Sequence, residues 1–213
     1  MLRFLQFSFV FFTAVIVNGQ NTFDSFKDRS VAAGTNFNYT ATTSTTAIIE
    51  FSKANKDYIN VNTLSDDLEN TDRSVFMWIK APTNVSSTRQ YMFGINAVTG
   101  STIRCSIGLN KSERLIVYDG ATIRTTTTDL GDDQWHYVGY TYNNSTYETK
   151  IYVDGRVEKT YTNTQTTFAG DRYSIGQHYA GTTSTARHYD GALSEVSVWN
   201  TILDKTDIAT AMN

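Results

Sequence analysis

Short runs of residues that alternate between apolar and polar recur from Ala47 onward, and turn-forming pairs such as Asp-Gly separate them. A period of two is typical of β-strands, whose successive side chains point to opposite faces. The pattern predicts about a dozen strands: Ala47 to Phe51, Tyr58 to Val61, Ser74 to Lys80, Gln90 to Ile95, Thr102 to Gly108, Arg114 to Tyr118, Ala121 to Thr126, Trp135 to Tyr142, Thr149 to Val153, Arg156 to Thr162, Tyr173 to Gly176 and Ala192 to Trp199. No helical pattern separates them, so the sequence predicts two packed antiparallel sheets.

The turn signals are strongest between Asp132 and Thr162. Trp135 to Tyr142 is rich in strand-forming residues, Asn143-Asn144-Ser145 is a turn, and Asp154-Gly155 joins the next two strands. A type I′ turn needs positive φ at both central residues, which Asp and Gly tolerate. This segment therefore predicts a three-strand meander.

Two strands indicate which faces are covered. Ser74 to Lys80 is apolar at both parities, which favours a central strand that is buried on both faces. In Leu193 to Trp199 the two valines share one face, whereas Glu195 and Ser197 share the other. The second strand is expected to have a dry side and a wet side.

The last segment alone has a helical pattern. Asp204 can cap a helix over Lys205 to Met212, with Asp207 three residues after the cap. Ile208 and Met212 would then face the sandwich. The sequence predicts a short C-terminal helix that packs on a sheet.

The N-terminal segments differ from the rest in composition. Residues 1–20 combine an early positive charge with an apolar run and a small residue near the end, which is typical of a secretory signal peptide. Residues 21–46 are polar and Thr-rich and resemble a leader or linker, with an added edge strand from Asn36 to Thr40 as the alternative. Residues 47–213 form the domain. We therefore expect a secreted or cell-surface protein that has no membrane association once the signal peptide is removed.

Composition and charge narrow the possible partners. The chain has 213 residues, a formal net charge of −3 and a single cysteine. The charge gives no basic footprint for nucleic acid, and one cysteine excludes an intramolecular disulfide. Cys105 shares the parity of Ile103 and Ile107, which favours a small buried hydrophobe over a reactive thiol.

The chain resembles the laminin G-like, concanavalin A-like jelly-roll domains of the compact type in three blocks that follow the family's order. These are Ile48 to Lys80, which ends in S-V-F-M-W-I-K, the Trp135-His136 pair with I-Y-V-D-G downstream, and Tyr173 to Asp204, which contains Y-D-G-A-L-S-E-V-S-V-W-N. The resemblance covers most of the chain. It implies an all-β jelly-roll sandwich with a closing helix and a structural role for His136, but it says little about a ligand.

Catalysis has to be considered because some glycosidases share this sandwich. Retaining glycosidases need two carboxyl groups about 5–5.5 Å apart. Glu195 has Ser197 and Trp199 at the partner positions of its strand, so the acid pair is missing. No G-x-S-x-G elbow, H-E-x-x-H motif or phosphate-binding glycine loop occurs either. We predict that the protein is not an enzyme, and a glycoside hydrolase is the weakest alternative.

Aromatic rings with polar side chains nearby favour a lectin-type site, because a sugar presents an apolar ring face and many hydroxyl groups. The predicted ligand-binding residues flank one loop and lie in the last strand: Gln177, Tyr179, Arg187, Tyr189 and Glu195. Cross-strand tyrosine pairs also stabilise a sheet without a ligand, so a structural role for the rings is the alternative.

Related jelly rolls often hold one structural calcium ion, and the resemblance implies Asp190 as its acidic ligand. Calcium binds about six to eight oxygen atoms. A tight turn at Asp190-Gly191 would explain the same residues without a metal.

The sequence thus predicts a secreted, non-catalytic recognition module that binds carbohydrate or glycoprotein at a cell surface or in the extracellular matrix. The alternative is a structural subunit that self-associates, or contacts other chains, in an extracellular assembly. In a eukaryotic host the protein could also be a glycoprotein. N-x-S/T sequences begin at Asn38, Asn84, Asn110, Asn143 and Asn144.

Overall fold

The computed structural model describes residues 15–17, 20–22, 31–33, 38–41, 47–62, 70–83, 88–96, 103–163, 172–178 and 187–212. Its elements are β1 (Val15–Val17), β2 (Gln20–Thr22), β3 (Val31–Ala33), β4 (Asn38–Ala41), β5 (Ala47–Phe51), β6 (Ile59–Asn62), β7 (Arg73–Lys80), β8 (Gln90–Asn96), β9 (Ile103–Leu109), β10 (Arg114–Tyr118), β11 (Ile123–Asp129), β12 (Trp135–Tyr142), β13 (Glu148–Val153), β14 (Arg156–Thr162), β15 (Arg172–Ile175), β16 (Gly191–Trp199) and α1 (Lys205–Ala211). Every strand expected from the alternation is present, with ends that differ from the prediction by a few residues.

In the described part of the chain, the strands form two seven-stranded sheets and a separate β1–β2 pair. The front sheet has the order β14-β13-β12-β7-β16-β5-β4, and the back sheet has the order β11-β10-β9-β8-β15-β6-β3. All the pairings are antiparallel. The two-sheet jelly-roll sandwich expected from the sequence is therefore confirmed. β4 lies where the alternative edge strand was expected.

The main core lies between the two sheets. Strand β7 contributes Val75, Met77 and Ile79, each fully buried. Cys105 belongs to the same core, and burial raises the pKa of its thiol to about 11, so the thiol stays protonated as expected for a structural residue. Alternate residues of one strand thus fill the inter-sheet space.

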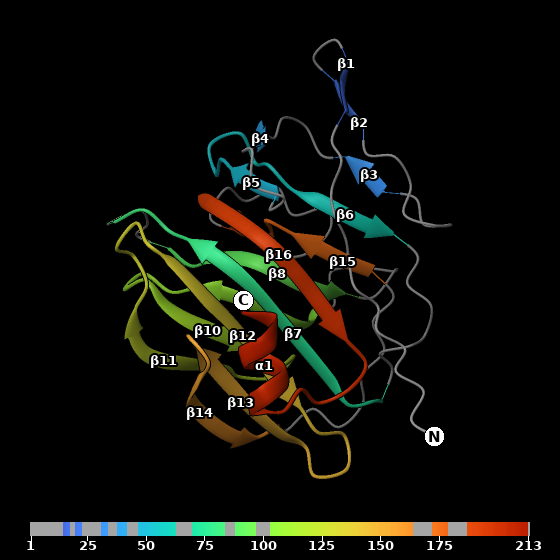
Figure 1. Ribbon diagram of the computed structural model, residues 1–213, viewed down its shortest axis with the longest axis vertical. Coiled ribbons are helices and arrows are strands. Elements are labelled where there is room, and N and C mark those ends of the chain that lie inside the picture. The colour runs from blue at the N-terminus through green and yellow to red at the C-terminus, as the bar shows by residue number, and fades with distance from the viewer. Residues whose placement is uncertain are drawn as a thin grey trace.

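A second, smaller core covers the outer face of the front sheet, where Figure 1 shows α1 lying across the strands. Phe76, Tyr137 and Tyr152 pack there with Leu203 and Ile208 of the C-terminal segment. This confirms that β7 is covered on both faces.

The C-terminal helix begins with the expected cap. The Asp204 side chain accepts hydrogen bonds from the backbone N–H groups of Thr206 and Asp207, and Asp207 completes the capping box. Within the described residues, no helix has the length and apolar character needed to cross a membrane.

Two turns show how local chemistry sets the backbone. Asp154 and Gly155 have φ values of 48° and 73°, the positive pair that the hairpin between β13 and β14 requires. In β16 the register shifts between Ser194 and Ser197, and Glu195 has a φ of 50°. The sequence did not predict this β-bulge. Val196 and Val198 keep a spacing of two whether or not the strand contains the extra residue.

Candidate functional site

A row of residues crosses the outer face of the back sheet. Tyr91 of β8 lies opposite Gly108 of β9, which lies opposite Ile116 of β10, and Ile116 lies opposite Thr125 of β11. The neighbours of Ile116, Leu115 and Val117, belong to the inter-sheet core. The row therefore lies on the opposite side of the sheet from the core.

A hollow of about 490 Å³ opens on this face above β10 and β11. We call it the β10–β11 pocket. It is lined by Thr88, Arg89, Asn110, Lys111, Ser112, Ile116, Ile123, Thr125 and Arg187. Ile116 is fully buried, whereas Arg89, Lys111 and Ser112 are exposed. The pocket thus combines an apolar floor with polar and cationic walls.

The turn between β9 and β10 places one wall of the pocket. The Asn110 Oδ1 atom accepts hydrogen bonds from the backbone N–H groups of Ser112 at 2.8 Å and Arg114 at 3.1 Å. Glu113 takes a φ of 56°, and its backbone N–H donates to the Asn110 carbonyl. Because Oδ1 is engaged, the Asn110 amide nitrogen is what remains to donate hydrogen bonds into the pocket.

Arg187 also lines the pocket, and two rings hold its side chain. Its Nη1 lies 3.5 Å from the Tyr91 hydroxyl oxygen and 3.3 Å from the His178 Nδ1 atom. The His178 ring stacks on Tyr91 with a centroid distance of 3.8 Å. Burial, together with the charges of Arg187 and Arg89, lowers the pKa of His178 to about 3. His178 is therefore neutral near pH 7, and its Nδ1 accepts the hydrogen bond that Arg187 donates.

The structure separates the residues that the sequence grouped into one site. Arg187 lines the pocket, whereas Gln177 is fully buried and pairs with His188 in an isolated bridge. Tyr189 is also fully buried, and its hydroxyl donates to the Lys80 carbonyl oxygen at 3.0 Å. Tyr189 therefore presents no ring face to a ligand at the surface. Tyr179 lies outside the described residues.

Glu195 lies away from the pocket, on the bulge of β16 in the front sheet. Burial raises the pKa of Tyr137, a residue of the core beneath α1, and the nearby charge of Glu195 adds to the rise. Among the described residues, none forms a hydrogen bond or ion pair with the Glu195 carboxylate.

Asp190 lies beside a second carboxylate, that of Asp57. The Asp190 Oδ1 accepts from the Lys53 backbone N–H at 3.2 Å, and the Asp57 Oδ2 accepts from the Ser52 N–H at 2.9 Å. Burial raises the pKa of Asp57, the Ser52 hydrogen bond partly offsets this, and the Asp190 charge raises it further. The buried Asp57 Oδ1 makes no hydrogen bond within the described residues.

Asp57 and Asp190 could supply some of the oxygen ligands that a calcium ion needs. A cation would relieve the repulsion between Asp57 and Asp190 and satisfy the buried Asp57 oxygen. In the described ranges no three His, Cys, Asp or Glu side chains gather as a metal cluster. Further oxygen atoms would have to come from backbone carbonyl groups or water. Calcium at Asp190 stays a prediction, now with Asp57 as its partner.

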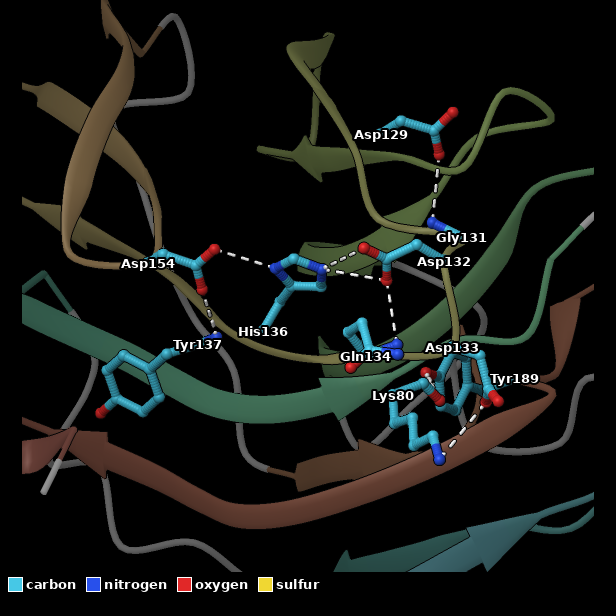
Figure 2. A network of polar contacts seen from close by, with 10 residues as sticks. All are labelled: Lys80, Asp129, Gly131, Asp132, Asp133, Gln134, His136, Tyr137, Asp154 and Tyr189. Atoms are coloured by element: carbon cyan, nitrogen blue, oxygen red, sulfur yellow. Dashed lines mark hydrogen bonds and ion pairs between the residues drawn. The ribbon is translucent and has the colours of Figure 1, made fainter.

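His136 lies between two aspartates at the start of β12 (Figure 2). Its Nδ1 is 2.8 Å from the Asp154 Oδ2 atom, and its Nε2 is 3.2 Å from the Asp132 Oδ1 atom. The other Asp154 oxygen accepts from the Tyr137 backbone N–H at 2.9 Å. Burial alone would lower the pKa of His136, but the hydrogen bonds and charges of Asp154, and then of Asp132, raise it above its usual value. The cluster ties the β13–β14 turn to β12, which agrees with the structural role expected for His136.

We expect an NMR titration of His136 to give a pKa above 6.5 and Asp154→Asn to lower it. Because the folded pKa is raised, the stabilisation from this cluster is complete below the unfolded pKa and is lost as pH rises through the folded pKa. Urea unfolding of the wild type and His136→Gln at several pH values should therefore show a stability gap that narrows with rising pH. A gap that widens with rising pH would contradict this assignment.

Most of the pocket was not found from the sequence. Arg89 and Thr125 belong to no motif, and the negative net charge gives no indication of a local group of cations. The usable signal was the Asn110-Lys111-Ser112 turn, which the sequence marks only as a possible glycosylation acceptor. The three cations of the pocket, Arg89, Lys111 and Arg187, come from separate segments of the chain, so their proximity depends on the tertiary structure.

Comparison with known proteins agrees with this architecture. Residues 53–209 match the family described as the concanavalin A-like lectin/glucanases superfamily. A comparison with curated proteins gave no match.

Three solved structures illustrate the similarity in fold. A candidate carbohydrate-binding protein from Bacteroides ovatus is 21% identical with a TM-score of 0.57, and the match covers 71% of this chain and 43% of that one. A heptameric SAP-like pentraxin from Limulus polyphemus is 17% identical with a TM-score of 0.57, covering 72% and 75%. Botulinum neurotoxin type C, whose cell entry depends on interaction with two ganglioside molecules, is 14% identical with a TM-score of 0.64, covering 85% and 46%.

These identities support a shared fold alone. The chain also spans less than half of the Bacteroides ovatus and neurotoxin chains that it matches.

Proposed function

Because the chain belongs to the concanavalin A-like lectin/glucanases superfamily, we propose that it is a secreted, non-catalytic recognition module that binds carbohydrate or glycoprotein at a cell surface or in the extracellular matrix. The observation that carries the proposal is the β10–β11 pocket on the outer face of the back sheet. Similar structures include one candidate carbohydrate-binding protein and one toxin that interacts with gangliosides, which supports this class of ligand.

The lining of the pocket suits a saccharide. Ile116 and Ile123 provide an apolar surface for the face of a sugar ring. Around them, Asn110, Ser112 and Thr125 offer amide and hydroxyl groups to a ligand rich in hydroxyls. Both kinds of contact lie within one concave site of suitable size for a small saccharide.

The acid residues support a non-catalytic role. A retaining glycosidase needs two neighbouring carboxyl groups, and the residues described in the lining of the β10–β11 pocket include none. Glu195 lies on β16 in the other sheet, where Ser197 and Trp199 occupy the next alternate positions of the strand. Hydrolysis of a saccharide by the purified protein would overturn this part of the proposal.

Binding can be tested on a glycan array with protein made in a bacterial host, so that no glycan occupies the Asn110 acceptor beside the pocket. We expect the wild type to bind, and Thr125→Trp to abolish binding by filling the pocket. Thr160→Trp is a matched control, because Thr160 is exposed on β14. Binding that is unchanged by Thr125→Trp would rule out this pocket as the site.

Thermal melting in calcium chloride and in EDTA tests the proposal that Asp190 and Asp57 bind calcium. We expect calcium to raise the melting temperature of the wild type but not of Asp57→Asn or Asp190→Asn. Equal melting temperatures with calcium and with EDTA would remove calcium from the proposal.

One observation favours the alternative of a structural subunit. Val157 lies on β14, the outermost strand of the front sheet, and its side chain is 49% exposed. An edge strand with an exposed apolar residue can pair with another chain, and the similar pentraxin is heptameric. Light scattering on the purified protein separates the two proposals: a large assembly with no glycan bound would favour the subunit.

A further inference from the structure

We propose that the β10–β11 pocket selects anionic saccharides, and that Arg89, Lys111 and Arg187 bind the carboxylate or sulfate group. The ring of the same sugar would lie against Ile116 and Ile123. This inference rests on the proposed carbohydrate-binding function and adds the chemical class of the ligand.

The charge of the pocket is opposite to that of the whole chain. The formal net charge of the chain is −3, yet the described residues of the pocket lining include three cations and no acid. A concave site that is lined by one sign of charge concentrates ligands of the opposite sign. A neutral sugar would not need this arrangement, because hydroxyl and amide groups are enough to bind it.

Within the described ranges, no acidic side chain forms an ion pair with any of the three cations. Neither Arg89 nor Lys111 forms a hydrogen bond or ion pair with another residue in the described ranges. The polar contacts of Arg187 are the Tyr91 hydroxyl and the neutral His178 ring. Glu113 is close in sequence, but its carboxylate lies against Gly131, which follows β11, and Glu113 is not among the lining residues of the pocket.

Arg187 is also positioned before any ligand binds. Its guanidinium carbon lies 5.8 Å from the centre of the Tyr91 ring, and Tyr91 is almost completely buried between its neighbours. A planar guanidinium group can donate two parallel hydrogen bonds to a carboxylate or sulfate. Because the rings already restrict the side chain, little of its freedom is lost on binding.

Carboxylate and sulfate groups both accept hydrogen bonds from a guanidinium group. The test therefore compares saccharides that share one backbone and differ in the anionic group. Lactose, 3′-sialyllactose and 3′-sulfolactose differ in the group that they carry, and lactose is the neutral parent of the other two. Affinities are measured by calorimetry for the full-length protein. Polyphosphate serves as a polyanion without a sugar ring.

The variant Arg89→Gln/Lys111→Gln/Arg187→Gln removes the three charges. Its matched control is Arg156→Gln/Lys159→Gln/Lys205→Gln, which removes three exposed cations on β14 and α1. A second variant, Arg89→Gln/Lys111→Gln, keeps the packed Arg187 in case the triple variant does not fold. Circular dichroism and thermal melting establish that each variant is folded.

We expect at least one anionic saccharide to bind about tenfold more tightly than its neutral parent, which corresponds to one additional charge-assisted contact. The pocket variants should lose that preference, while the control keeps it. Raising the salt concentration should lower the affinity for the anionic saccharide and leave the affinity for the neutral one nearly unchanged, since salt screens exposed charges.

Three results would overturn the proposal in distinguishable ways. Neutral sugars that bind as tightly as anionic ones, and that Thr125→Trp still blocks, would remove the charge preference and leave the carbohydrate function standing. Polyphosphate that binds as tightly as the best saccharide would show a site for polyanions in general. If neither neutral nor anionic saccharides bind, the carbohydrate function itself fails.

Discussion

Replacing Phe76 with alanine is expected to lower the free energy of unfolding by about 3–5 kcal/mol. Phe76 is fully buried beneath α1, where it stacks on Tyr137 with a centroid distance of 5.4 Å and contacts Tyr152 and Trp199. Truncation removes the transfer energy of the ring and leaves a cavity that rigid sheet residues cannot fill. Urea denaturation followed by fluorescence measures the change.

Two further variants separate packing from other causes. Phe76→Leu keeps most of the volume and should cost less than about 1.5 kcal/mol. Ile208→Ala removes the buried contact of α1 with the same core, so its effect should not add to that of Phe76→Ala. If the two alanine variants were fully additive, α1 would not be packing on Phe76 as described.

Replacing Gly108 with alanine is expected to destabilise the fold by about 1–3 kcal/mol and to weaken saccharide binding by the protein that remains folded. A β-carbon at Gly108 would lie 2.1 Å from the Gln90 carbonyl oxygen and 2.9 Å from a carbon of the Tyr91 ring. The strand can relieve the clash only by moving β8 and Tyr91. Because Tyr91 holds Arg187, the movement should displace a wall of the β10–β11 pocket.

Gly139→Ala is the matched control for Gly108→Ala. A β-carbon at Gly139 would lie 2.2 Å from the Val75 carbonyl oxygen and 2.4 Å from the Phe76 ring. The clash is similar, but it lies in the front sheet. We expect a similar loss of stability, measured by urea denaturation, with unchanged affinity measured by calorimetry well below the melting temperature. Equal affinities for both variants would show that Tyr91 does not control the pocket.

The two predictions concern different faces of the sandwich. The outer face of the front sheet is covered by α1 and stabilises the fold, whereas the outer face of the back sheet carries the pocket. Glu195 lies on the first face and Arg187 on the second, so a single site that contains both is not formed. The sequence grouped them because Tyr189 and Asp190 connect them along the chain within a few residues.

The sequence by itself determined the strands, the turns and the closing helix. The apolar residues at both parities of Ser74 to Lys80 already predicted that both faces of β7 are covered, and Asp154-Gly155 and the Asp204 cap appeared as expected. These features depend on residues within a few positions of one another. Turn chemistry, capping and the period of two are therefore readable in the chain alone.

Only the tertiary structure decided which polar residues meet. The β10–β11 pocket brings together Arg89, Lys111 and Arg187 from three distant segments. Tyr189 lies in the core, where its hydroxyl donates a hydrogen bond to the Lys80 carbonyl oxygen. The bulge that carries Glu195 was likewise set by the pairing of β16 with β7. Sheet order and loop convergence depend on long-range packing, which no local pattern of residues encodes.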